Sequence, residues 1–108
     1  MLRPILAALV IVAAAGAACA QTAGDAAEGG ELARRWCGNC HVVGRGSGTS
    51  PATGDAAPTF ASIAAMPSTT ALSLRAFLQT PHHRMPDFAL TRAETDNLIA
   101  YILSLKAN

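Results

Sequence analysis

The chain has 108 residues, of which 51% are hydrophobic and 14% are charged, and its formal net charge is +1. This length is enough for one small domain and excludes a multidomain enzyme. Hydrophobic residues are concentrated at the N-terminus, and the rest of the chain has few large apolar side chains because alanine is so frequent. A domain with so small a core is expected to need a cofactor or another stabilising cross-link.

Residues 1–20 have the layout of a secretory signal peptide. A positive residue, Arg3, precedes an unbroken apolar run over 5–15, and the segment ends in a small-residue Ala-Cys-Ala sequence. A helix from the start of that run to Ala20 would reach about 24 Å, which is short of the ~30 Å hydrocarbon core. We therefore expect cleavage after Ala20 and export to the periplasm. An uncleaved membrane anchor and a lipid on Cys19 are the alternatives.

Residues 21–108 are expected to form the mature domain, whose charges balance. Loss of the first twenty residues removes one of the eight basic residues, which leaves seven basic and seven acidic residues. Phosphate binding requires a clustered basic excess, so nucleic acid is not an expected partner.

The first predicted helix begins at Asp25. Asp25 and Glu28 have the spacing of a capping box, and small residues then recur at helical spacing from Ala26 up to Cys37. A stripe of small residues lets another backbone approach closely. We therefore expect this helix to cross a partner helix tightly.

The middle of the domain is predicted to be loops and short helices. An irregular connector is expected over 44–55, which is rich in Gly, Ser, Thr and Pro. A short apolar turn follows Pro58. A further helix, capped by Ser68 or Thr70, should end before Pro81.

The last predicted helix begins at a second capping box, formed by Thr91 and Glu94. Its apolar residues follow at i, i+3, i+4 and i+7, namely Leu98, Tyr101, Ile102 and Leu105. This face makes it the partner expected for the first helix. No stretch alternates apolar and polar residues with β-branched enrichment, so the predicted fold class is all-α.

The motif that indicates a cofactor is Cys37-Gly-Asn-Cys40-His41, which has the C-x-x-C-H pattern of c-type haem attachment. Two thiols three residues apart at the end of a helix can add to the two vinyl groups of one porphyrin edge, with His41 held under the iron. A thioredoxin-like dithiol would need a βαβ context. A zinc site would need four ligands, and only His82 and His83 are available beyond the motif. The prediction is one covalently attached haem c with its iron.

A thioether sulfur on the far side of the iron would raise the reduction potential, and two methionines are candidates. Met85 lies in a loop before the last helix, where Pro86 forces it out of the helical region. Met66 also precedes a proline, but in a more apolar turn, and is interpreted as a flexible core filler. His82 and His83 are interpreted as solvated loop residues, although either one could replace Met85 and give a low-potential bis-histidine centre.

The chain resembles a small bacterial class I cytochrome c over most of residues 25–108. The resemblance rests on Gly29 eight residues before Cys37, on CGNCH, and on the segments APTF, FLQTPHHRMP and NLIAYILSL. It implies a cytochrome c-like fold, a few short helices and loops wrapped around one haem. It also implies that the first and last helices cross.

The same resemblance assigns roles to residues of the site. It implies that Cys37 and Cys40 bear the haem thioethers, that His41 is the proximal iron ligand and that Met85 is the distal one. It further implies that the Pro58 carbonyl accepts a hydrogen bond from His41, which would fix the tautomer of that ring.

The function implied by this reading is a periplasmic carrier of single electrons and not an enzyme, because six-coordinate iron has no position open to substrate. The expected partners are redox proteins, namely a membrane respiratory complex, a terminal oxidase or a periplasmic dehydrogenase, which dock weakly on a monomer. Membrane association is expected only if the N-terminal segment is retained. Two alternatives are a dedicated cytochrome subunit or acceptor of a periplasmic dehydrogenase, and a haem gas sensor in which Met85 is labile.

Overall fold

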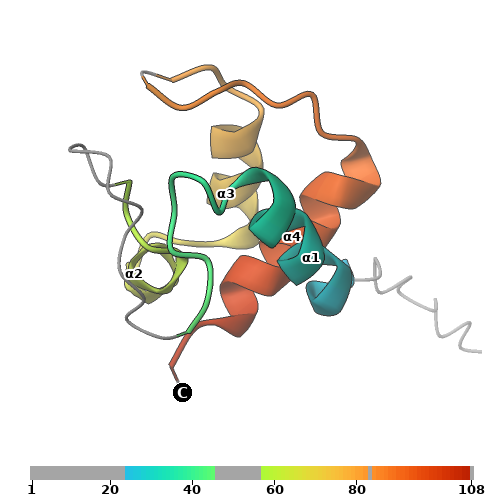
Figure 1. Cartoon of the computed structure of the whole chain (residues 1–108). Helices are drawn as coiled ribbons and strands as arrows, with labels where there is room; N and C mark the ends of the chain where they lie inside the picture. Colours follow the sequence, from blue (N-terminus) through green and yellow to red (C-terminus); the bar gives the residue numbers. More distant parts are fainter. Residues whose placement is uncertain (1–23, 46–56, 83, 108) are drawn as a thin grey trace, which may run out of the picture.

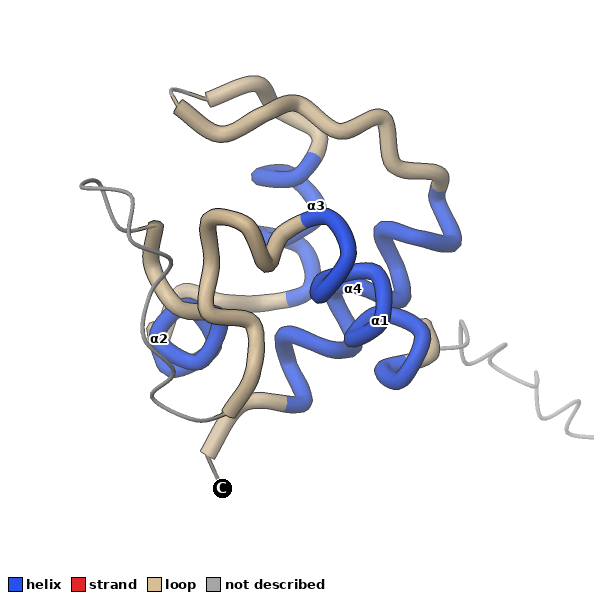
Figure 2. The backbone as a smooth tube through the Cα atoms, in the orientation of Figure 1, coloured by secondary structure: helices blue, strands red, loops and turns tan. Residues whose placement is uncertain are grey.

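The computed structural model describes residues 24–45, 57–82 and 84–107. Within them the chain forms helices joined by loops and contains no strand, as Figures 1 and 2 show. The helices are α1 (Ala26–Trp36), α2 (Phe60–Ala65), α3 (Ala71–Leu78) and α4 (Arg92–Ser104). The all-α prediction is confirmed, and none of these helices is long and apolar enough to cross a bilayer.

Three predictions fall on parts of the chain that lie outside the described residues. They concern the signal peptide over 1–20, the connector over 44–55 beyond Arg45, and His83.

Asp25 caps the N-terminus of helix α1, as predicted. The Asp25 carboxylate accepts hydrogen bonds from the backbone N–H groups of Ala27 at 2.8 Å and Glu28 at 3.0 Å. The predicted capping box also required the N–H of Asp25 to donate to the Glu28 side chain, and this part of the prediction is wrong. That N–H donates instead to the Asn97 side-chain oxygen at 2.8 Å. Asn97 belongs to α4, so a tertiary contact takes the place of the local one.

Helices α1 and α4 cross at the small-residue face of α1, which confirms the predicted pairing (Figure 1). The approach is closest at Gly29, where an added Cβ would lie 1.9 Å from the carbonyl oxygen of Asn97. At Gly30 an added Cβ would lie 3.1 Å from the ring of Tyr101, and Ala33 is fully buried. Only residues with little or no side chain allow the two backbones to come this close.

The core is built around α4, on which the other three helices pack. Helix α4 starts at the predicted capping box, in which Thr91 and Glu94 each accept a hydrogen bond from the backbone N–H of the other. The hydroxyl of Tyr101 donates to the Val43 carbonyl at 2.6 Å, which ties α4 to the loop after α1. The buried apolar side chains are Ala33, Phe60, Ala64, Leu74, Leu98, Ile99, Ile102 and Leu105.

The short helices α2 and α3 are fixed by their caps. Of the two predicted caps for α3, Thr70 is the one used, and the helix ends before Pro81 as predicted. The interpretation of Met66 as a core filler is wrong, because its side chain is 48% exposed. Met66 follows the last residue of α2, and Phe60 and Ala64 are the residues of that helix that fill the core.

Candidate functional site

The segment from Cys37 to His41 forms a turn that continues directly from the end of α1. The carbonyl of Cys37 accepts hydrogen bonds from the amides of Cys40 at 3.1 Å and His41 at 2.9 Å. Gly38 is required inside the turn, since a Cβ there would lie 2.8 Å from the carbonyl oxygen of Arg34. The backbone therefore holds the two thiols and the imidazole in a fixed relation to α1.

The His41 ring is oriented by the segment that enters α2. Its Nδ1 lies 2.6 Å from the carbonyl oxygen of Pro58, and because a carbonyl only accepts, Nδ1 is the nitrogen that donates. The ring also packs against Phe60, with 5.2 Å between centroids. In this tautomer the Nε2 of a neutral ring keeps its lone pair, which is the form that binds a metal ion.

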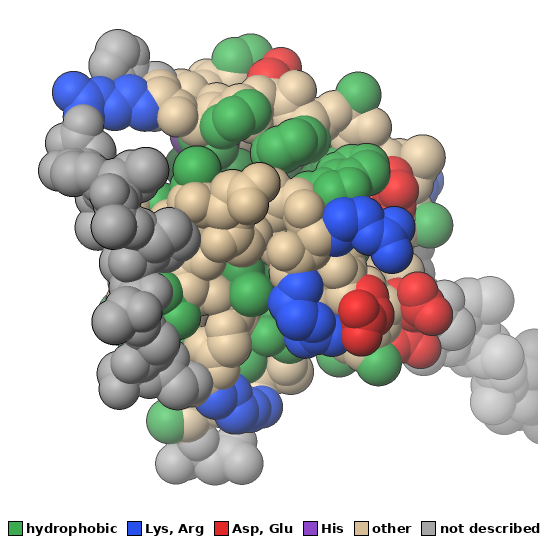
Figure 3. All heavy atoms as spheres, viewed as in Figure 1, with side chains coloured by type: hydrophobic (Ala, Val, Ile, Leu, Met, Phe, Trp, Pro, Cys, Tyr) green, Lys and Arg blue, Asp and Glu red, His purple; other side chains and the backbone are tan. Residues whose placement is uncertain are grey.

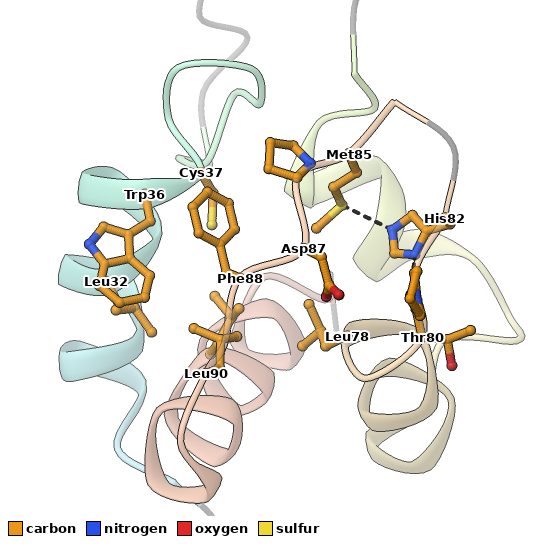
Figure 4. Close-up of a pocket in the computed structure, with 13 residues that line it drawn as sticks. Leu32, Trp36, Cys37, Leu78, Thr80, His82, Met85, Asp87, Phe88 and Leu90 are labelled. Atoms are coloured by element: carbon orange, nitrogen blue, oxygen red, sulfur yellow. Dashed lines mark hydrogen bonds between the residues drawn. The ribbon is translucent and has the colours of Figure 1, made fainter.

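An open pocket lies between the end of α1, the loop that precedes α4, and α4 itself (Figure 4). The enclosed part of this pocket has a volume of about 20 Å³, and the pocket opens to solvent at its mouth. Most of its walls are apolar. The lining residues are Leu32, Trp36, Cys37, Leu78, Thr80, Pro81, His82, Met85, Pro86, Asp87, Phe88, Leu90 and Leu98.

The structure brings Cys37 and Met85 to this one pocket, the first from the end of α1 and the second from the loop before α4. Cys40 and His41 do not line it, and Cys40 is exposed. Pro58 is also exposed, and it contributes through its backbone carbonyl.

An aromatic pair forms part of the pocket wall, and its member Phe88 was not predicted from the sequence. The rings of Trp36 and Phe88 stack with 5.7 Å between centroids and 29° between planes. Phe88 lies in a loop with no helical periodicity, so nothing in its neighbours indicates that it faces α1. The only available signal was its aromatic side chain.

The environment of Cys37 differs from that of a thioredoxin-like dithiol. Burial raises the pKa of the Cys37 thiol above its ordinary value, and the neighbouring Cys40 adds to the rise. A redox dithiol works through a thiol whose pKa is lowered, so this environment does not suit a thioredoxin-like pair. Across residues 24–45, 57–82 and 84–107, no three His, Cys, Asp or Glu side chains are grouped as a metal site.

Residues 24–102 match the family model described as cytochrome c oxidase, cbb3-type, subunit III. The chain belongs to the cytochrome c family. It is also 40% identical over 97 residues to cytochrome c-552 of Bradyrhizobium diazoefficiens, and the matched residues make up 90% of each chain. No solved structure matches the chain.

As a c-type cytochrome, the protein carries covalently bound haem c with its iron and transfers electrons with redox proteins. The site fits this cofactor on its own geometry. Cys37 lines a largely apolar pocket, and hydrogen bonds to its carbonyl hold Cys40 and His41 in the same turn. The imidazole of His41 is fixed in the tautomer that leaves Nε2 for a metal. The expectation of a single covalently attached haem c is thereby confirmed at the level of the family.

Proposed function

We propose that this cytochrome is a periplasmic carrier of single electrons in which Cys37 and Cys40 bear the haem and His41 and Met85 are its axial ligands. The observation that carries the proposal is that Cys37 and Met85 line one apolar pocket while the Pro58 carbonyl orients His41. When bound, the haem supplies a reversible one-electron couple between Fe(II) and Fe(III).

The axial residues have separate tasks in this proposal. His41 offers Nε2 while its Nδ1–H donates to the Pro58 carbonyl, which fixes the ring and increases its basicity. Met85 offers a thioether sulfur, which raises the reduction potential. The stacked rings of Trp36 and Phe88 help to keep water out of the pocket, and low solvent exposure also sets the potential.

The electron-carrier and gas-sensor hypotheses differ in whether Met85 stays bound to the iron. If His41 and Met85 both stay bound, no position is open to a substrate or a gas, and we expect no catalysis by this chain alone. The reduced protein should then bind carbon monoxide poorly. Ready binding of carbon monoxide at low concentration would favour the sensor.

Redox proteins are the partners of this family, and we propose a terminal oxidase as the electron acceptor because the family description names an oxidase subunit. Figure 3 shows hydrophobic side chains gathered over part of one face, beside basic and acidic ones. We expect monomeric protein to dock weakly, through a patch below about 1,200 Å². Since the mature chain is neutral, the rate of oxidation by such an oxidase should change little with added salt.

The domain organisation in this proposal is a cleaved signal peptide over 1–20 and a cytochrome domain over 21–108. Support comes from the charge and hydrophobicity pattern of the N-terminus. The mass of the protein recovered from the periplasm tests it, with Gln21 as the expected first residue. A mass that retains the segment would instead indicate a membrane anchor, and a lipid mass on Cys19 would indicate a lipoprotein.

The ferric optical spectrum tests the axial pair. The wild-type protein should show the weak long-wavelength charge-transfer band of thioether sulfur on ferric haem, and Met85→Ala should abolish it. Met66→Ala is the matched control and should keep the band, since Met66 is exposed at the end of α2 and does not line the pocket. A band that persists in Met85→Ala would show that Met85 is not the ligand.

A further inference from the structure

The imidazole of His82 lies against Met85 inside the pocket. Its Nε2 is 3.1 Å from the Met85 sulfur, a contact marked by a dashed line in Figure 4. The ring is half-buried and lines the pocket wall. This differs from the sequence-based interpretation of His82 as a solvated loop residue, because the loop folds back over the pocket.

A second contact determines which nitrogen of His82 carries the proton. Nδ1 lies 2.6 Å from the carbonyl oxygen of Thr80, which can only accept, so Nδ1 donates. In the neutral ring Nε2 is then left with a lone pair, and a thioether sulfur likewise has lone pairs and no proton. Two electron-pair donors, His82 Nε2 and Met85 Sδ, therefore converge on one place in the pocket.

The surrounding structure holds His82 in this position. Its ring packs against Phe77 of α3, with 3.7 Å between centroids. The hydroxyl of Thr80 bonds a carbonyl in the last turn of α3, which anchors the carbonyl that orients the imidazole. Between His82 and Met85, Arg84 takes a left-handed conformation with φ of 70°, and this change of direction brings both side chains to the same pocket.

We propose that His82 is a second distal ligand, which binds the iron through Nε2 when the sulfur of Met85 leaves it. The inference rests on the proposed function, because it takes Met85 as the resident ligand. A thioether raises the potential of haem iron, so replacing it with imidazole lowers the potential. With His82 in place of Met85, the protein would still supply a ligand for the iron on this side, which would exclude small gases, and the lower potential would make the iron a weaker electron acceptor.

The test compares haem-loaded variants in the ferric state, with the spin state read from the electron paramagnetic resonance spectrum. Met85→Ala should remain fully low-spin, because His82 fills the vacated position. Met85→Ala with His82→Asn should become high-spin. Met85→Ala with His83→Asn is the matched control and should stay low-spin.

Added imidazole checks that the pocket of the high-spin double variant is intact, and it should restore the low-spin spectrum. The proposal is overturned if Met85→Ala alone is high-spin, if the His82→Asn double variant stays low-spin, or if added imidazole fails to bind. The wild-type charge-transfer band reports separately on Met85. If that band is absent in the wild type, the proposed axial pair fails, whatever ligand the variants reveal.

Discussion

Gly29→Ala should separate α1 from α4 and destabilise the domain. The new Cβ would lie 1.9 Å from the carbonyl oxygen of Asn97, which is 1.1 Å inside the 3.0 Å that real Cβ contacts keep. The obstructing atom is backbone, so it cannot rotate away, and the whole helix crossing must open. Overpacking of this kind costs about 3 kcal/mol at the upper end of its usual range.

An opposing effect reduces that cost, because alanine favours a helix over glycine by about 1 kcal/mol. The net loss in the free energy of unfolding is then about 2 kcal/mol. For a domain of this size that corresponds to a fall in Tm of roughly 8–16 °C, measured by circular dichroism on the haem-loaded protein.

Gly30→Ala is the matched control, because it has the same helix-propensity gain at the neighbouring position. Its Cβ would meet the Tyr101 ring at 3.1 Å, and a side chain can move by a few tenths of an ångström. We expect its stability to stay within about 1 kcal/mol of the wild type, since the propensity gain offsets a mild contact. If Gly29→Ala is as stable as the wild type, or if both variants lose the same stability, the backbone contact at Gly29 does not limit the approach of the two helices.

Three further predictions concern the helix caps and the loop after α1. Thr91→Ala removes the cap of α4 and should cost about 1 kcal/mol in thermal unfolding, whereas an unchanged Tm would show that the cap is dispensable. Hydrogen bonds from the Thr91 backbone and side chain hold the pKa of Glu94 below its ordinary value, so the stability they add is present above that value and is lost as the pH falls through the lowered one. An acid titration of unfolding should show this loss in the wild type but not in Glu94→Gln. Tyr101→Phe leaves the Val43 carbonyl without its donor and should cost about 1–3 kcal/mol in denaturant unfolding, with equal stability as the contrary result.

Much of the fold follows from local patterns in the sequence. The cap at Thr91 and the end of α3 before Pro81 could be predicted because caps and prolines act on their immediate neighbours. The crossing of α1 and α4 could also be predicted, since a stripe containing Gly30 and Ala33 fits only a close helix contact.

Local sequence patterns did not predict which side chain forms a hydrogen bond with each backbone N–H or carbonyl group outside the helical hydrogen-bond pattern. The N–H of Asp25 bonds Asn97 from α4, although Glu28 has the spacing for the local bond. The carbonyl of Val43 bonds Tyr101, fifty-eight residues away. Such choices depend on distances between distant segments, which no local spacing specifies.

The candidate site could likewise be predicted only in part from the sequence, and the rest depends on the tertiary structure. The sequence by itself determined the attachment motif from Cys37 to His41, because its chemistry depends on the spacing of adjacent residues. It also offered Met85 as a candidate ligand through the resemblance of its segment to the family, since Met66 precedes a proline as well. Only the tertiary structure decided that Phe88 stacks on α1 and that His82 reaches the Met85 sulfur. The loop that bears these residues has no repeating pattern, and its course is set by the helices on which it packs.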